Sequence, residues 1–243
     1  MLWALMTTEY FKIRKTRILS LLFISPVFAG VVGFATSDLL SGSNKWLASL
    51  LAMSVTHSLL LLPLIIGVLA SFICRYEHLH GGWKQLLSLP VRREHVYLAK
   101  FIMIAVLIAV NQLLFGISWI LVGAVKGFTD PIPLEALWKS LAGGWISTLP
   151  LAALLLFVSM AWSSFAAPLA LNVVFTLPNI LVANSKQYAP YYPWVQPFLT
   201  MLPKGDGPWG GFFTSFESLT FAICGSLLLF FAAGLLYIRQ KAI

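Results

Sequence analysis

The stretch from Arg75 to Lys100 reads RYEHLHGGWKQLLSLPVRREHVYLAK and is the largest block of charge in the chain. A long apolar run ends at Ile73 just before it, and another begins near Val96. Three of the four histidines also lie within this block. A polar segment between two such runs is expected to lie in water, between two membrane spans.

The composition indicates an integral membrane protein. Of the 243 residues, 59% are hydrophobic and only 10% are charged, whereas a soluble domain is about half apolar and about a quarter charged. No polar stretch is long enough for a separate soluble domain, so we expect one membrane domain over residues 1–243. The net charge of +8 is better explained by topology and by contact with membrane lipids than by nucleic-acid binding.

Six apolar runs are long enough to cross a bilayer, which predicts an all-α membrane protein with six transmembrane helices. They are 18–36, 46–73, 96–125, 141–162, 165–182 and 219–238. We expect Pro63 to kink the second run. The first run could instead be a signal peptide, but its basic flank is long and amphipathic, and many spans follow it.

Residues 1–16 are expected to form an amphipathic helix lying on the membrane surface. Its polar side carries Thr8, Glu9, Lys12 and Lys15, its basic end includes Arg14, and its apolar side carries Leu2, Trp3, Met6, Tyr10 and Ile13. A polar tail without regular structure is the alternative.

The distribution of lysine and arginine orients the spans. With the N-terminus in the cytoplasm, 11 of the 16 basic residues fall on the cytoplasmic side, including every arginine. The positive-inside rule therefore places both termini in the cytoplasm.

Residues 184–218, on the outer side, are too aromatic for a simple loop. The segment carries Tyr188, Tyr191, Tyr192, Trp194, Trp209, Phe212 and Phe213, residue types that are common at membrane interfaces. Its prolines forbid one long helix. Short segments that dip back into the outer leaflet would suit this composition if protein covers their backbone.

No catalytic or metal-binding constellation is present in the sequence. There is no G-x-x-x-x-G-K-[ST] motif, so we expect this chain to hold neither ATP nor another cofactor. His57, Asn111, Gln112 and Asn172 are the notable polar residues within the spans. They could line a substrate path, or they could hydrogen-bond between packed helices.

A membrane chain without ATP or ion chemistry suggests a partner that supplies energy. In the charged block, Leu79, Trp83, Leu86 and Leu87 recur with helical spacing, and Pro90 ends the pattern. Gly81 and Gly82 permit a tight turn or close approach of another backbone. An apolar stripe in a charged rim is typical of a protein interface, with Trp83 as its anchor; a loop helix resting on the membrane is the alternative.

This block resembles the corresponding region of ABC exporter permeases of the second exporter class. It is especially similar to the small permeases of lantibiotic-immunity and bacitracin-resistance transporters. The likeness lies in Glu77, residues 82–87 (GWKQLL), residues 89–91 (LPV), Arg93, Tyr97 and Lys100, with further likeness in residues 9–15 and 191–197. Many members of that family have a threonine after a single glycine here, whereas this chain has Gly81 and Gly82 directly before Trp83.

The resemblance implies a permease in a bacterial plasma membrane that pairs with a second copy or a related chain. Its 74–95 loop would be a coupling helix on an ABC ATPase dimer, which binds ATP and Mg²⁺, and short re-entrant helices would join spans five and six. The expected docking residues are Glu77, Gly82, Trp83, Lys84, Leu86, Leu87, Arg92 and Arg93. The cargo would be a lantibiotic-like amphipathic peptide or a hydrophobic compound. The alternatives are a non-transporting anchor or sensor partner of an ATPase, and an intramembrane enzyme.

Overall fold

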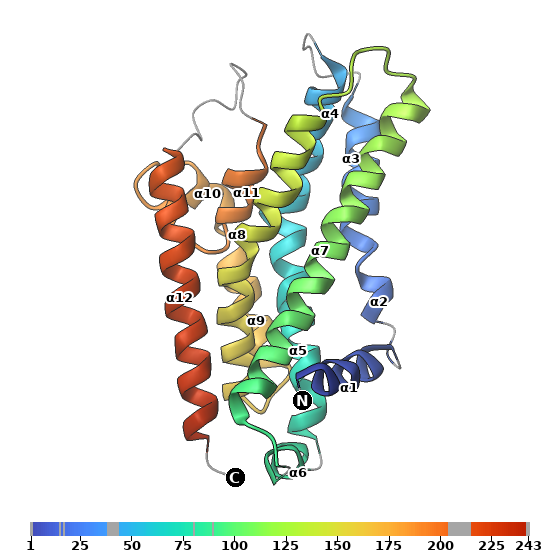
Figure 1. Cartoon of the computed structure of the whole chain (residues 1–243). Helices are drawn as coiled ribbons and strands as arrows, with labels where there is room; N and C mark the ends of the chain where they lie inside the picture. Colours follow the sequence, from blue (N-terminus) through green and yellow to red (C-terminus); the bar gives the residue numbers. More distant parts are fainter. Residues whose placement is uncertain are drawn as a thin grey trace.

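The computed structural model describes residues 2–14, 16, 18–37, 44–79, 81–88, 90–203 and 215–241. Within these ranges every regular element is a helix, and the long helices run side by side as one bundle (Figure 1). The prediction of an all-α protein is confirmed for this part of the chain.

The helices follow one another along the chain with short connections. They are α1 (Leu2–Arg14), α2 (Ile18–Leu21), α3 (Ile24–Thr36), α4 (Lys45–Thr56), the π-helix η1 (His57–Leu61), α5 (Leu62–His78), α6 (Gly82–Ser88), α7 (Arg93–Lys126), α8 (Leu134–Ala161), α9 (Ala166–Thr176), α10 (Asn179–Ala183), the 3-10 helix η2 (Ala189–Tyr191), α11 (Gln196–Met201) and α12 (Phe216–Gln240).

Five helical segments of the described chain are long and apolar enough to cross a membrane. They are Ile18–Thr36, Lys45–His78, Arg93–Lys126, Leu134–Ala161 and Glu217–Gln240. The run expected at 165–182 forms two shorter helices instead, α9 and α10, because Pro178 begins a new helix. The bundle is that of a multi-pass membrane protein, and the count of six spans stays a prediction.

Local signals explain where several helices begin and end. Asn44 caps α4, since its side-chain oxygen accepts hydrogen bonds from the backbone N–H groups of Trp46 and Leu47. Ser215 caps α12 by accepting from the N–H of Ser218. Gly127 ends α7 with a left-handed backbone at φ 66°, which glycine adopts without steric cost. These three helix ends are therefore marked in the local sequence.

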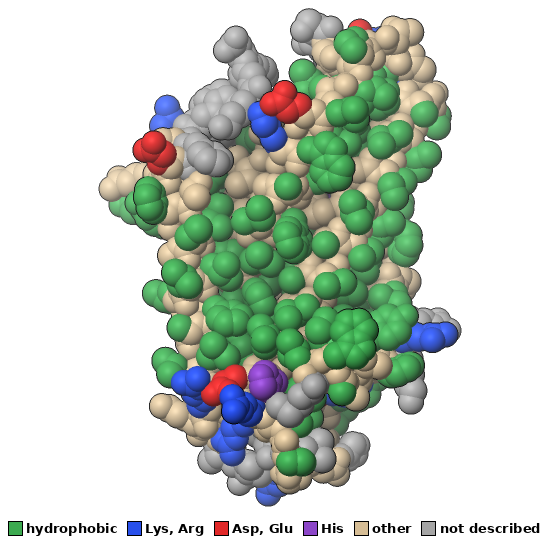
Figure 2. Space-filling view, viewed as in Figure 1, with side chains coloured by type: hydrophobic (Ala, Val, Ile, Leu, Met, Phe, Trp, Pro, Cys, Tyr) green, Lys and Arg blue, Asp and Glu red, His purple; other side chains and the backbone are tan. Residues whose placement is uncertain are grey.

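The surface has the distribution of side chains that a bilayer requires. Figure 2 shows a broad hydrophobic band between two ends at which charged residues gather. The exposed side chains of α3 and α7 within this band include Val27, Val31, Leu113, Ile117 and Leu121. Such faces are expected to contact lipid, because lipid tails solvate apolar side chains as well as a protein core does.

Both termini lie at the same end of the bundle as α6 (Figure 1). The helices that flank α6 extend further than the sequence pattern predicted, because α5 continues to His78 and α7 begins at Arg93. The connection between these two helices is therefore 79–92, which lies within the expected coupling loop 74–95. Leu79 lies before the turn and outside α6, so it is not the first residue of a continuous helical stripe.

Toward the opposite end lies α11, whose side chains are almost all buried (Figure 1). The hydroxyl of Ser140 on α8 donates to the carbonyl of Met201, and Ser147 is hydrogen-bonded to Thr200. A short helix with its backbone covered by protein is what the prolines and aromatic residues of 184–218 favoured. Whether α11 re-enters the outer leaflet stays a prediction.

The aromatic residues of this outer segment divide into two groups. Tyr188 and Tyr191 are exposed, as interfacial residues would be, whereas Trp194 is buried. Trp194 is inside because its indole N–H donates to the side-chain oxygen of Asn172, 2.8 Å away. The expected interfacial residues Trp209, Phe212 and Phe213 lie outside the described residues.

Candidate docking site at the α6 end

A two-glycine turn places α6 beneath the bundle. Gly81 has φ 72°, in the left-handed region that favours glycine. A Cβ on Gly82 would lie 2.6 Å from the carbonyl oxygen of Tyr76 and 2.9 Å from Cα of Glu77. The turn therefore needs both glycines, one for its backbone angle and one for its close approach to α5. The expectation drawn from this glycine pair is confirmed.

Trp83, the second residue of α6, faces the chain itself. Its side chain is 8% exposed, and its indole N–H donates to Nδ1 of His78 at 3.2 Å. The ammonium of Lys241 lies 4.5 Å from the centroid of the Trp83 ring, within the range of a cation–π contact. Trp83 therefore seats α6 on the bundle, and its role as the anchor of an interface with a partner stays a prediction.

The C-terminal end of α8 meets these same residues. His78 donates from Nε2 to the carbonyl of Ser159 at 2.7 Å, and Lys241 donates to the carbonyl of Met160 at 2.6 Å. Since α8 ends at Ala161, its last carbonyls have no partner within the helix. Half-burial lowers the pKa of Lys241 from its usual value. Trp83 thus lies between two side chains that cap α8.

The other face of α6 is polar. Lys84, Gln85 and Ser88 are exposed, and so is Arg92 just before α7. Leu86 is half-buried, and the side chain of Leu87 lies outside what the structure describes. An approaching partner would therefore meet a polar, basic surface first.

Arg93, another expected docking residue, binds the end of the chain. Its Nη1 donates to the carbonyls of Arg239 and Lys241, at 3.1 and 2.8 Å. Nε of Arg239 in turn lies 2.7 Å from a carboxylate oxygen of Glu94. Together these contacts hold the tail after α12 against the start of α7.

Glu77 belongs to a buried ion cluster rather than to the exposed surface. Lys100 on α7 lies 3.0 Å from its carboxylate and 3.1 Å from that of Glu9 on α1. Lys12 contacts the same two carboxylates at 2.6 and 2.8 Å. Burying one of these charges alone would cost several kcal/mol, on the order given for an unpaired buried ion. Because two cations and two anions lie together, each charge is paired and that cost is offset.

The ion cluster decides how α1 lies on the bundle. Glu9 and Ile13 are buried against the protein, whereas Trp3, Tyr10 and Arg14 are exposed. The sequence predicted that the polar side of this helix faces water. In the structure Glu9, on that polar side, faces the protein, and the aromatic side chains face outward. Figure 1 shows α1 crossing the bundle near α5 and α7, as an interfacial helix would.

Two of the four polar residues predicted for the spans donate to backbone carbonyls of other helices, and one of these carbonyls has lost its helical donor to a proline. Pro26 cannot donate to the carbonyl of Leu22, and Nδ2 of Asn111 donates to that oxygen at 2.7 Å. Nδ2 of Asn172 donates to the carbonyl of Pro63 at 2.9 Å. Both contacts favour the helix-packing alternative over a substrate path for Asn111 and Asn172.

Pro63 does more than bend its helix. It follows the π-helix η1 and leaves the carbonyl of Leu59 without a helical donor, and Nδ2 of Asn179 on α10 supplies one at 2.6 Å. A Cβ on Gly67 would clash with Asn172, so this glycine admits the second asparagine to the helix backbone. The expected kink is a π-helical turn held by side chains from α9 and α10.

His57 and Gln112 are also buried, near the middle of the bundle. His57 is hydrogen-bonded through Nδ1 to the hydroxyl of Ser25 and stacks on Phe115, with ring centroids 4.4 Å apart. Gln112 contacts the sulfur of Met201 at 3.5 Å. Nε2 of His57 and Oε1 of Gln112 have no partner among the residues the structure describes. Their place in a substrate path stays a prediction.

Sequence reasoning missed several residues of this site. No pattern in the sequence indicates a role for Lys241 or Ser159, because their contacts join two segments that are distant in sequence. Lys100 could have been identified as a buried, paired residue, since a lysine inside an apolar run needs a partner. Asn179 could also have been identified, because it is a polar residue within the apolar run 165–182.

Comparison with known proteins agrees with this architecture. The sequence model of the ABC-2 family of transporter proteins matches residues 5–179, which include most of α1, all of α6 and the ion cluster. The bacitracin transport permease protein BCRB of Bacillus licheniformis is 21% identical over 134 residues, which cover 53% of this chain and 62% of that relative. The family model covers most of the chain, and the chain belongs to the ABC-2 family of transporter proteins.

Proposed function

We propose that the chain is the transmembrane subunit of an ATP-driven exporter and that a separate ABC ATPase subunit docks on α6. The observation that carries the proposal is that α6 is fixed to the bundle by Trp83 while Lys84, Gln85 and Ser88 face outward. A transmission element needs a rigid attachment and a free surface. Family membership supports an ATPase partner, and ATP with Mg²⁺ would be bound there.

The contacts around α6 suggest how a movement would be transmitted. A push on α6 would reach the end of α8 through Trp83, His78 and the carbonyl of Ser159. It would also reach α1 through the close contact between Gly82 and Glu77. Both routes are continuous chains of packed or hydrogen-bonded groups, and such chains can carry energetic coupling between two sites.

For the cargo, we propose an amphipathic peptide, lantibiotic-like, or a hydrophobic compound that leaves the membrane. The support is that a relative of this chain is a bacitracin transport permease, together with the exposed apolar sides of the bundle. We further propose that a second copy or a related permease completes the transport path.

The docking surface can be tested without disturbing the core. Lys84→Glu and Arg92→Glu together reverse two exposed charges on the α6 side. We expect co-purification with a co-expressed ABC ATPase that binds the wild-type chain to fall at least about tenfold, because like charges replace complementary ones. Lys139→Glu is the matched control, since Lys139 is exposed on the opposite end. Unchanged ATPase association in the double variant would overturn the docking surface.

A second measurement separates export from a role as a non-transporting anchor or sensor. The complex is reconstituted into vesicles containing a fluorescent amphipathic peptide, and its ATP-dependent redistribution is followed. Movement that requires both ATP and this chain supports export. ATPase association without any movement favours the anchor or sensor.

A further inference from the structure

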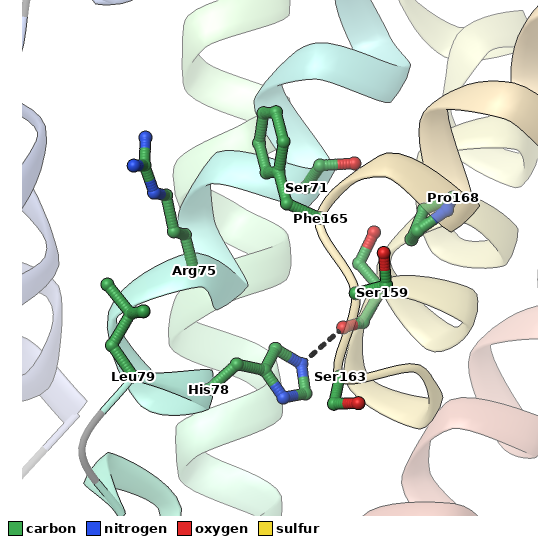
Figure 3. Close-up of a pocket in the computed structure, with 9 residues that line it drawn as sticks. Ser71, Arg75, His78, Leu79, Ser159, Ser163, Phe165 and Pro168 are labelled. Atoms are coloured by element: carbon green, nitrogen blue, oxygen red, sulfur yellow. Dashed lines mark hydrogen bonds between the residues drawn. The ribbon is translucent and has the colours of Figure 1, made fainter.

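A cavity of about 400 Å³ opens at the α6 end of the bundle, between α5 and the link from α8 to α9. Figure 3 shows Ser71 and His78 reaching toward it from α5, with Ser159 and Phe165 on the other side. Its volume is within the range of sites that bind small molecules. Its position places it at the edge of the hydrophobic band rather than in the middle of the bundle.

The cavity carries one positive charge and no acidic side chain. Arg75 is exposed, and its guanidinium stacks on the rings of Phe72 and Phe165 at 5.6 and 5.5 Å. Among the described residues no carboxylate pairs with Arg75, whereas Lys12 and Lys100 on the neighbouring helices are both paired. The charge of Arg75 is thus available to an anion from outside the chain.

Two buried hydroxyl groups line the same cavity without a hydrogen-bond partner. Ser71 is 3% exposed and Ser159 is 2% exposed, and the Oγ atom of each lacks a partner in the described structure. Ser71, Arg75 and His78 are spaced i, i+4, i+7, so they share one face of α5. Buried hydroxyls without partners are costly, and a bound acceptor would remove that cost.

His78 cannot supply the missing partner or a second charge in this arrangement. Its Nε2 donates to the carbonyl of Ser159, and its Nδ1 accepts from the indole of Trp83. An imidazole that donates from one nitrogen and accepts at the other is neutral. The remaining wall, which includes Phe165, is largely apolar.

We propose that this cavity binds the phosphate-bearing head group of an anionic lipid from the leaflet on the α6 side. Arg75 balances the charge, the hydroxyls of Ser71 and Ser159 donate to phosphate oxygens, and Phe165 contacts the start of the acyl region. A phosphate group is the acceptor that suits one guanidinium and two hydroxyls. The apolar wall and the position at the band edge favour a lipid over free phosphate.

The test uses the full chain, purified and exchanged into nanodiscs or detergent. Native mass spectrometry counts retained lipid after equilibration with phosphatidylglycerol, with phosphatidylcholine, or with inorganic phosphate alone. Arg75→Gln removes the charge, and Ser164→Asp places a like charge in the exposed link that lines the cavity. Arg14→Gln is the control, because Arg14 is an exposed cation on α1 at the same end.

We expect the wild-type chain to retain phosphatidylglycerol preferentially and Arg75→Gln and Ser164→Asp each to reduce retention about tenfold. Arg14→Gln should retain the lipid as the wild type does. Equal loss in Arg14→Gln, no preference for the anionic lipid, or binding of inorganic phosphate with no lipid would each overturn the proposal. Ser164→Asp changes an exposed loop and keeps the test valid if Arg75→Gln fails to fold. ATPase association is measured separately, so failure here leaves the docking proposal standing.

Discussion

The ammonium of Lys100 lies 3.1 Å from both carboxylate oxygens of Glu9, although 91 residues separate the two in the chain. Lys100 is fully buried on α7, and it also donates to the carbonyl of Ile73 on α5. One lysine therefore holds three helices together. Because Glu77 and Lys12 complete the same cluster, the position of α1 is tied to the helix that leads into α6.

Replacing Lys100 with methionine should destabilise the protein strongly. Lys100→Met leaves the carboxylates of Glu9 and Glu77 with only the half-exposed Lys12 to balance them. We expect a loss of about 3–5 kcal/mol in unfolding free energy, the usual cost of breaking a buried ion pair. Denaturant titration of the purified chain in detergent measures this loss.

The control for Lys100 is Lys139→Met at the far end of the bundle. Lys139 pairs with Glu135 on the surface of α8, and such exposed pairs contribute at most about 1 kcal/mol. Similar stabilities for the two variants would show that the cluster is not buried in the membrane-embedded protein.

Asn172 should be needed for stability rather than for transport. Asn172→Leu removes the hydrogen bond to the carbonyl of Pro63 and leaves the indole N–H of Trp194 without its partner, and an orphaned buried group costs about 1–3 kcal/mol. We expect a lower melting temperature by differential scanning fluorimetry. Asn184→Leu, at an exposed asparagine of α10's C-terminus, should change it little. A thermally unchanged Asn172→Leu that loses only transport would restore the substrate-path interpretation.

Trp83 should respond to substitution as a core residue does. Trp83→Ala is expected to cost about 3–5 kcal/mol through the cavity it leaves. Trp83→Phe keeps most of the packing and loses the bond to His78, at a cost of about 1 kcal/mol. Trp3→Ala is the comparison, because Trp3 is exposed on α1. If urea titration gives Trp83→Ala and Trp3→Ala equal stabilities, α6 is not seated as described.

The orientation of the bundle is open to chemical labelling. In a Cys74→Ser, Cys224→Ser background, we expect Lys84→Cys to react with a membrane-impermeant maleimide only after the cells are permeabilised. Lys139→Cys should react in intact cells, because it lies at the opposite end of the bundle from α6. The reverse pattern would place α6 outside the cell and exclude docking by a cytoplasmic ATPase.

Much of the fold was readable before the structure, because membrane spans depend on composition over about 20 residues. Five of the six predicted runs appear as long apolar helices, and the glycine pair before α6 forms the expected turn. The run at 165–182 became two short helices. Its prolines were visible in the sequence, but whether they break or merely bend a helix depends on what packs beside them.

The sequence by itself determined the hydrophobic band, the long apolar helices, the basic end with α6 and the family to which the chain belongs. These properties depend on local composition and on short patterns. Tertiary structure alone decided that Glu77 and Trp83 turn inward, that α1 faces the bundle with Glu9, and that Asn111 and Asn172 satisfy backbone carbonyls. The physical reason is that a buried charge or polar group takes its role from its partner. For Glu9, Asn111 and Asn172 the partner lies 89 to 109 residues away, where no periodicity can identify it.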